Sequence, residues 1–249
     1  METPVTQQTP PGRGGRPMLR LWSLEVVEAM DAEPSMRRVV FTAPDIAEFD
    51  YKPGQALVLM IPLSSGETGR RDYTIRWFDR DAGKLAIDFL LHGETPGPQW
   101  ARAAKAGDRL DARGPRGGTV FHPEADWHLL TGDETCIPAI AHILETIPAD
   151  AVAHVFIETQ EASGEIPMAR PVTWLHRGGQ PAGPGALMAD AVAAFALPEG
   201  RGHAYLIGET SNVRAQRRLL VERGFTREQI SSEGYWRPGR IGGHDHVED

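Results

Sequence analysis

The sequence predicts a two-domain chain, with an N-terminal antiparallel β-barrel of six strands followed by an α/β domain built on a parallel sheet. Its 249 residues exceed the length of a typical single domain, which is about 100 to 200 residues. Up to about Arg113, short apolar stretches alternate with turn residues, as in an all-β fold. Beyond Phe121, strand-like stretches alternate with helix-like ones, which is typical of a parallel sheet with crossover helices.

The first half contains six candidate strands. Turn-forming segments such as Lys52-Pro53-Gly54 and Asp81-Ala82-Gly83 separate them, and one helix near Pro98–Lys105 interrupts the series. Closely spaced short strands of this kind predict a small antiparallel barrel. The expected strands are Leu21–Met30, Met36–Thr42, Gln55–Ile61, Asp72–Phe78, Lys84–Leu91 and Arg109–Arg113.

The second half begins with an expected strand at Trp127–Thr131. The next segment is an expected helix, because Ile137, Ile140, Ala141 and Leu144 recur at helical spacing. The remaining expected elements are strands at Ala151–Thr159, Val172–His176 and His203–Ile207 and helices at Ala186–Ala196 and Asn212–Arg223. For the last helix, Ser211 is the expected N-cap and Gly224 the expected C-cap.

These patterns divide the chain into a disordered tail (1–17), a barrel (18–122), an α/β domain (123–240) and a flexible tail (241–249). The opening tail is rich in Pro, Gly, Gln and Thr and has no apolar stretch of the kind that a signal peptide needs. No apolar run approaches the roughly 18 residues that span a bilayer. We therefore expect a soluble protein without stable membrane insertion. We also expect a monomer in the cytoplasm, whose reducing conditions fit a chain with one cysteine.

Charge and cysteine content exclude several classes of protein. The formal net charge of -8 gives no overall attraction to nucleic acid, so no nucleic-acid partner is expected. Cys136 is the single cysteine, which excludes an internal disulfide, a cysteine-based zinc site and a cysteine-ligated iron–sulfur cluster. No metal site is expected.

The segment Arg71–Arg76 combines an aromatic ring, a hydroxyl and guanidinium groups on one expected strand. Side chains alternate along a strand, so Tyr73 shares a side with Arg71, while Thr74 shares the other with Asp72 and Arg76. Tyr can lie against a flat ring system, and Arg can bind a pyrophosphate. The candidate ligand is a flavin dinucleotide, and an ordinary half-buried strand with solvated arginines is the alternative.

Three further segments have the composition of ligand-binding turns. Leu91–Ala101 joins a strand to a helix start through a glycine-rich loop, and Thr131–Thr135 and Ile207–Ser211 each join a strand end to a helix start. The chain lacks a G-x-G-x-x-G after a strand, and Asp133 with Glu134 would repel a phosphate if they pointed inward. Each segment is therefore also compatible with a structural turn.

In order along the chain, these motifs resemble the siderophore-interacting protein family of FAD-dependent ferric-siderophore reductases, which is related to the ferredoxin reductase superfamily. The resemblance runs from about Leu19 to Gly239. Its motifs are R-x-Y-T-x-R, H-G-x-x-P-x-x-x-W-A, G-P-R-G, G-D-E-T-x-x-P-A-I, W-L-H-R, G-E-x-S-x-V-R-x-x-R-R and Y-W-R-P-G.

The resemblance implies a set of cofactor residues. FAD would bind in the barrel, at Arg71, Asp72, Tyr73, Thr74 and Arg76, and along His92, Gly93, Trp100 and Ala101. NADH or NADPH would bind the second domain at Thr131, Gly132, Asp133, Glu134, Thr135, Gly208 and Glu209, with Tyr235 and Trp236 returning toward the flavin. The chain departs from the family pattern at Thr95, Pro98 and Gln99, where a glycine, a serine and an arginine are usual.

The implied reaction passes electrons from NAD(P)H through FAD to Fe(III) in a ferric siderophore and so releases Fe(II). Flavin is suited to this task because hydride donors move two electrons and iron accepts one. Lys52, Arg113, Arg116 and Arg237 are the expected cationic contacts to an anionic chelate. No catalytic acid or base is expected, since the cofactor transfers the electrons.

Two other functions remain open from the sequence. One is a general NAD(P)H-dependent flavin or ferredoxin-type reductase, and the other is a non-catalytic carrier of flavin or chelate. The choice between NADH and NADPH is also open. Glu158, at the end of an expected strand, could bind a ribose hydroxyl, but that rule belongs to a fingerprint that this chain lacks.

Overall fold

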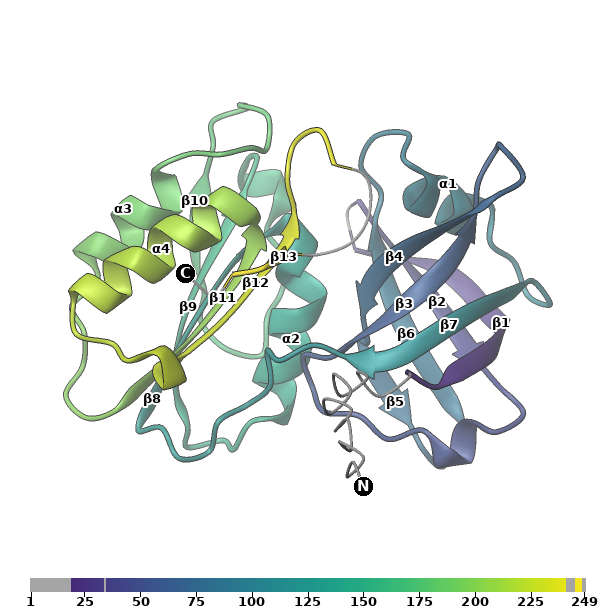
Figure 1. Cartoon of the computed structure of the whole chain (residues 1–249), viewed down its shortest axis with the longest axis horizontal. Helices are drawn as coiled ribbons and strands as arrows, with labels where there is room; N and C mark the ends of the chain where they lie inside the picture. The colour runs from purple at the N-terminus through teal and green to yellow at the C-terminus, as the bar shows by residue number, and fades with distance from the viewer. Residues whose placement is uncertain (1–18, 34, 241–244, 248–249) are drawn as a thin grey trace, which may run out of the picture.

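The computed structural model describes residues 19–33, 35–240 and 245–247. Two sheets lie side by side, and helix α2 (Ile137–Thr146) stands between them (Figure 1). The predicted tail 1–17 lies outside the described residues. No described helix has the length and apolar composition needed to cross a bilayer.

The N-terminal sheet, called the barrel below, has seven antiparallel strands in the order β4-β3-β7-β1-β2-β6-β5, and no ladder between described strands joins its edges β4 and β5. They are β1 (Leu21–Glu33), β2 (Met36–Thr42), β3 (Ala56–Pro62), β4 (Thr68–Thr74), β5 (Trp77–Asp79), β6 (Lys84–Leu90) and β7 (Arg109–Arg116). Helix α1 (Pro96–Ala103) connects β6 to β7. Side chains of β1 alternate, so that Trp22, Leu24 and Val26 enter the core while their neighbours face outward.

The strand expected at Asp72–Phe78 is two strands, so the prediction of six strands is wrong by one. β4 ends at Thr74 and β5 begins at Trp77. Between them, the Ile75 amide donates to the Gln55 carbonyl and the Arg76 amide to the Ala86 carbonyl, at 3.0 and 2.8 Å. Ile75 is 0% exposed, and burying it in the barrel core turns the chain from one sheet edge toward the other.

The C-terminal sheet has the order β10-β9-β8-β11-β12-β13. Its first five strands pair in parallel, and this confirms the predicted α/β class. The strands are β8 (Trp127–Asp133), β9 (Val152–Thr159), β10 (Thr173–His176), β11 (Gly202–Glu209), β12 (Ile230–Trp236) and β13 (Asp245–His246), and the other helices are α3 (Leu187–Ala194) and α4 (Thr210–Glu222).

β12 was not predicted, and the predicted flexible tail contains a short strand. Within the segment 241–249, Asp245–His246 pairs antiparallel with β12, and Val247 is buried. β12 has Ser231, Ser232 and Gly234 in its middle, so it lacks the apolar run by which the other parallel strands were found.

Helices cover both faces of the parallel sheet. α3 and α4 pack on one face, where Leu206 of β11 lies, and α2 packs on the other, against Tyr205 and Ile207 (Figure 1). Met36 and Leu90 of the barrel join the α2 side of this packing. α2 therefore packs against the parallel sheet on one side and against the barrel on the other.

The first turn of α4 differs in detail from the prediction. The N-cap is Glu209 rather than Ser211, because the Glu209 carboxylate accepts a hydrogen bond from the Asn212 amide at 2.9 Å. At the other end, Gly224 follows the helix with φ of 97°, a left-handed conformation that favours glycine.

Polar contacts also join α2 to the barrel. The Tyr51 hydroxyl lies 2.7 Å from His142 Nε2, and the two rings stack. Arg76 donates two hydrogen bonds to Glu145, each 2.6 Å long. The predicted bounds 18–122 and 123–240 divide the chain within the connection between β7 and β8, and we keep them as a proposal.

Candidate functional site

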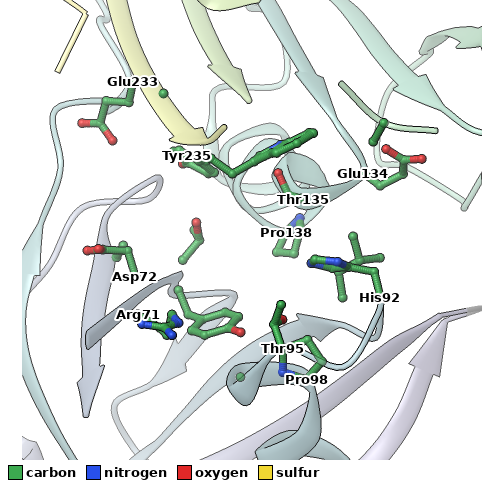
Figure 2. Close-up of a pocket in the computed structure, with 18 of the residues that line it drawn as sticks. Arg71, Asp72, His92, Thr95, Pro98, Glu134, Thr135, Pro138, Glu233 and Tyr235 are labelled. Atoms are coloured by element: carbon green, nitrogen blue, oxygen red, sulfur yellow. The ribbon is translucent and has the colours of Figure 1, made fainter. Parts of the chain in front are cut away.

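A cavity of about 540 Å³ lies between the barrel and the parallel sheet. β4 and the start of α1 form one side, and the start of α2 and the end of β12 form the other (Figure 2). Its size falls within the range typical of small-molecule sites. The predicted site residues that line it are Arg71, Asp72, Tyr73, Thr74, His92, Arg116, Glu134, Thr135, Tyr235, Trp236 and Arg237.

Tyr73 forms the barrel side of the cavity. Its ring packs on Phe89 with centroids 4.2 Å apart, and burial raises the pKa of its hydroxyl. Gly97 of α1 crosses so close that a Cβ at this position would lie 2.0 Å from the Tyr73 hydroxyl oxygen. Glycine is therefore required where α1 passes this ring. Gly97 was not among the predicted site residues, although it lies inside the predicted glycine-rich loop of Leu91–Ala101.

The first turn of α1 faces the cavity next to Tyr73. Thr95 is its N-cap residue, and the Thr95 side chain makes no capping hydrogen bond with the helix. Thr95 and Pro98 line the cavity (Figure 2). Gly97 between them is also part of the lining. A helix start carries a partial positive charge, so this turn favours an anionic group beside it.

Arginines give the cavity its local charge. Arg116 donates from Nε to Asp72 at 2.7 Å. Arg71 donates to the Arg70 carbonyl at 2.8 Å, and no carboxylate of the described residues pairs with it. Arg71 thus presents an uncompensated cation to the cavity, which suits a phosphate or pyrophosphate.

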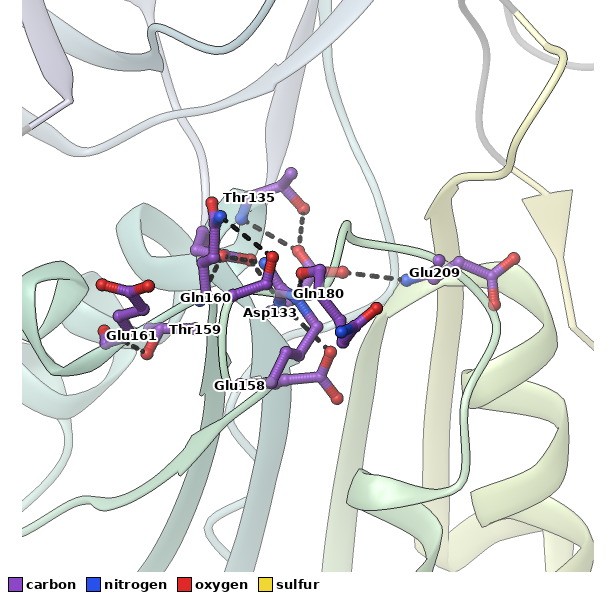
Figure 3. Close-up of polar contacts among 12 residues, drawn as sticks. Asp133, Thr135, Glu158, Thr159, Gln160, Glu161, Gln180 and Glu209 are labelled. Atoms are coloured by element: carbon purple, nitrogen blue, oxygen red, sulfur yellow. Dashed lines mark hydrogen bonds and ion pairs between the residues drawn. The ribbon is translucent and has the colours of Figure 1, made fainter.

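Asp133 holds together the edge of the parallel sheet behind the cavity (Figure 3). Its carboxylate accepts hydrogen bonds from the amides of Thr135 and Glu209, at 2.9 and 3.1 Å, and from the Trp236 indole at 2.8 Å. Burial raises the pKa of Asp133, and the bonds from Thr135 and Trp236 oppose that rise. The carboxylate is thus turned into the protein and away from the cavity.

Glu134 is neutralised by an arginine that the sequence analysis did not assign to the site. Arg177 donates to both Glu134 oxygens and also contacts Glu158 at 3.1 Å. The Gln160 amide donates to Glu134 at 2.9 Å as well. The repulsion of phosphate expected from Asp133 and Glu134 is therefore reduced at both residues. W-L-H-R, which ends at Arg177, was the sequence signal for this contact.

Several predicted site residues do not line the cavity. Arg76 points to Glu145 and Asp88, so the strand break at Ile75 separates it from Thr74. Trp100 and Ala101 belong to the barrel core, where Trp100 stacks on Phe41. The others outside the lining are Lys52, Gly93, Arg113, Thr131, Gly132, Asp133, Gly208 and Glu209.

Two of these residues still shape the site through close packing. A Cβ at Gly208 would lie 2.8 Å from Asp133 Oδ2, and a Cβ at Gly132 would lie 2.6 Å from the Cys136 Cβ. Both glycines let the sheet edge close around Asp133. They therefore act on the shape of the edge rather than by facing the cavity.

The end of β12 carries the second aromatic side of the cavity. The Tyr235 hydroxyl is buried close to Thr74, without a properly oriented hydrogen-bond partner among the described residues. Burial raises the pKa of Tyr235 well above its ordinary value, and Glu233 raises it further. The cavity residues that the sequence analysis did not assign include Asp88, Gly97, Gln160, Arg177, Glu233 and Arg240.

Known structures share this two-domain arrangement. The described fold superposes on a ferredoxin NADP+ reductase from Neisseria gonorrhoeae with a TM-score of 0.65 at 14% sequence identity, covering 87% of this chain and 99% of that one. The fold is therefore ferredoxin reductase-like. A siderophore utilization protein from T. fusca superposes with a TM-score of 0.81 at 36% identity and covers 90% of this chain and 95% of that one.

The chain belongs to the siderophore-interacting protein family. The family model "Siderophore-interacting protein" matches residues 125–239, and the model "Siderophore-interacting FAD-binding domain" matches residues 64–119. The ferric vibriobactin reductase ViuB of Vibrio cholerae is 31% identical over 244 residues, which cover 87% of this chain and 89% of that protein. An uncharacterized protein of Mycobacterium tuberculosis is 40% identical over 186 residues, covering 68% of this chain and 65% of that protein's length.

Proposed function

We propose that this protein is a ferric-siderophore reductase that passes electrons from NADH or NADPH through FAD to siderophore-bound Fe(III). The family and the match to its FAD-binding domain support the proposal. The observation that carries it is the cavity between the domains, with Tyr73 and the uncompensated Arg71 on the barrel side. We further propose that it acts in the cytoplasm as a monomer.

The residues of the cavity fit FAD. The Tyr73 ring packs at a tilt on Phe89, and Gly97 of α1 lies against its hydroxyl group. Arg71 supplies a cation without a carboxylate partner among the described residues. The Tyr235 hydroxyl is a buried polar group that lacks a well-oriented partner among the described residues. Burial of such a group is costly unless a hydrogen bond compensates it, so a polar ligand next to it is favoured.

In the proposed arrangement, Tyr73 and Thr74 bind the ring system and Arg71 binds the pyrophosphate. His92 and the first turn of α1 lie along the ribose and phosphate side, and Trp100 and Ala101 support that helix from the barrel core. Arg76 would act indirectly, through its contacts to Glu145 and Asp88. Bound FAD would supply the conversion from two-electron to one-electron transfer.

The nicotinamide donor would approach from the edge of the parallel sheet. Glu134 and Thr135 line the cavity there, and Arg177 keeps Glu134 compensated. Asp133 binds the Trp236 indole and the Glu209 amide and so holds this edge of the sheet in shape. Thr131, Gly132 and Gly208 would contribute to the same shape. Tyr235 and Trp236 close the cavity from the β12 side.

The ferric chelate would bind at the cationic part of the cavity. Arg116 and Arg237 line it, whereas Lys52 and Arg113 lie outside the lining and would act at longer range. Hard, often anionic oxygens hold Fe(III) in a siderophore and hold Fe(II) far more weakly, so reduction releases the iron. The protein's part is to position the chelate and attract its charge.

Anaerobic reduction tests this function. The protein is loaded with FAD, NADH or NADPH is added in the absence of oxygen, and loss of the flavin absorbance is followed. A ferric siderophore is then added together with a ferrous-iron trap. We expect bleaching by at least one donor, then return of the absorbance with formation of the ferrous complex.

The outcomes separate the alternatives. Failure to bleach with either donor would favour a non-catalytic carrier. Bleaching followed by reoxidation with a ferredoxin but not with any ferric chelate would favour a general ferredoxin-type reductase. A protein that binds no FAD at all would remove the basis of the proposal.

A further inference from the structure

A second cavity, of about 470 Å³, lies at the outer edge of the parallel sheet. Its lining comes from four parts of the chain: Arg217 of α4, residues 230–233 of β12, Val247 beyond β13 and the Gly117–Gly118 segment. In Figure 1 this is the region where α4 faces the β12–β13 edge. It shares Gly117 and Glu233 with the central cavity, but none of the predicted cofactor residues lines it.

Arg217 is a largely buried side chain, and its Nε has no hydrogen-bond partner among the described residues. Its exposed fraction is 6%. Among the described residues no carboxylate forms an ion pair with it. Arginine stays protonated in proteins, and a mostly buried guanidinium without a carboxylate partner carries a desolvation cost. A negatively charged group in the cavity would remove that cost.

The other residues of this cavity suit an oxyanion. Arg227 adds a second guanidinium, and Ser231 and Ser232 of β12 also line the cavity. Ser231 pairs with His203 Nε2 at 2.9 Å, and Ser232 already donates its hydroxyl proton to the Val247 carbonyl at 2.7 Å, so the two guanidinium groups are the donors on which the site depends. Glu233 is the one acidic residue among the described lining, and its Oε1 accepts from the Gly118 amide at 2.6 Å.

We propose that this second cavity is a binding site for the phosphate group of a small molecule. Two guanidinium groups match the charge of a phosphate dianion, and arginine binds phosphate through paired hydrogen bonds. The cavity is larger than one phosphate ion needs, so the natural ligand carries more atoms than its phosphate. The site is distinct from the cavity proposed for FAD and does not depend on redox activity.

Thermal unfolding with inorganic phosphate as the probe tests the site. The free chain is titrated with phosphate at constant ionic strength, with chloride as the reference salt. For the wild type we expect Tm to rise by about 5 to 10 °C when phosphate exceeds its Kd about 100-fold. For Arg217→Met this rise should be lost, and without phosphate the variant should unfold no lower than the wild type because a mostly buried charge without a carboxylate partner is gone.

Two further variants complete the test. Arg218→Met changes the exposed neighbour on the same helix and should respond to phosphate like the wild type. Arg227→Gln, at an exposed position on the cavity rim, should weaken phosphate binding about tenfold without affecting folding. A wild type that gains no more from phosphate than from chloride, or an unchanged response in both Arg217→Met and Arg227→Gln, would overturn the proposal.

Discussion

At the residue scale, the contact between Gly97 and Tyr73 decides the shape of the proposed FAD site. The missing side chain at Gly97 allows α1 to touch the hydroxyl of a ring that is itself fixed by Phe89. A single added methyl group cannot fit without moving the ring or the helix. The site is therefore sensitive to a change that leaves all its charges intact.

We predict that Gly97→Ala destabilises the protein by about 1 to 3 kcal/mol, the usual cost of overpacking, and lowers FAD affinity about tenfold. Thermal unfolding and a fluorescence titration of FAD measure the two effects. Gly183→Ala is the matched control, because a Cβ there meets nothing within 4 Å. Adding Tyr73→Phe to Gly97→Ala should restore part of the stability, and a double variant without any recovery would contradict this account.

Arg71 and Arg70 are adjacent arginines with different expected roles. Arg71 lines the cavity and has no carboxylate partner among the described residues, whereas Arg70 is exposed and lies outside the lining. We predict that Arg71→Gln weakens FAD binding by about 10- to 100-fold, since charge-assisted hydrogen bonds contribute about 1.5 to 3 kcal/mol. Arg70→Gln should leave the Kd for FAD unchanged, and equal losses in both variants would refute a specific contact.

At the element scale, α2 joins the two domains, and its contact to the barrel contains a buried histidine. His142 is 5% exposed and stacks on Tyr51. Burial, and after it the positive charge of Arg76, lowers the pKa of His142 to about 4, against a smaller opposing effect of Glu145. The neutral ring is therefore the form that this interface accommodates.

This histidine predicts how stability depends on pH. Between pH 6.5 and about 4 the unfolded chain binds a proton at His142 that the folded chain does not, so the free energy of unfolding falls as pH decreases. The full loss at this residue amounts to about 3 kcal/mol. His203, whose pKa burial lowers to about 3, adds to the wild-type loss in the same direction.

We predict that His142→Gln reduces the difference in unfolding free energy between pH 7 and pH 4.5, measured by urea denaturation. His176→Gln changes an exposed histidine of β10 and should leave that difference as in the wild type. If His142→Gln shows the full wild-type loss on acidification, His142 is not the group responsible.

Most elements could be predicted from the sequence because their patterns are local. The alternation in β1 and the helical spacing in α2 follow directly from which side chains are buried. The break at Ile75 could not be found in this way, since an apolar residue there fits a continuous strand equally well. The corner depends on hydrogen bonds to Gln55 and Ala86, which are distant in the chain.

At the scale of the whole molecule, the net charge of the chain and the local charge of the cavity act in opposite directions on an approaching anion. The chain carries a net charge of -8, whereas the cavity lining has five arginines against four carboxylates, and Arg71 among those arginines has no carboxylate partner in the described residues. Under the proposed function, an anionic ferric chelate would therefore be repelled at long range and attracted at short range. Added salt weakens the long-range repulsion before the short-range attraction, because the Debye length falls from about 30 Å at 0.01 M to about 8 Å at 0.15 M.

If the proposed function holds, kcat/KM for an anionic ferric chelate should rise between 0.01 and 0.15 M salt. A neutral ferric chelate should show a nearly constant value under the same conditions. Steady-state assays with the ferrous-iron trap measure both. A fall for the anionic chelate would mean that long-range attraction, rather than repulsion, governs its approach.

The candidate site was predictable to the extent that its residues are close in sequence. The side chains at 71–74 were assigned together and do line one cavity. Arg177 and Glu233 were not assigned, because their roles depend on contacts to Glu134 and Gly118 across the fold. Trp100 is a conspicuous residue in the sequence, yet it packs in the barrel core beneath the helix.

Met36 and Leu90 precede the domain boundary in the chain but pack with α2 and the parallel sheet. A fragment cut at the boundary would leave these two side chains facing water on the barrel surface. The barrel would then expose an apolar patch at the place where it now meets its neighbour. The two halves of this protein are thus separable in sequence and share one interior, which a cut at the boundary would open to water.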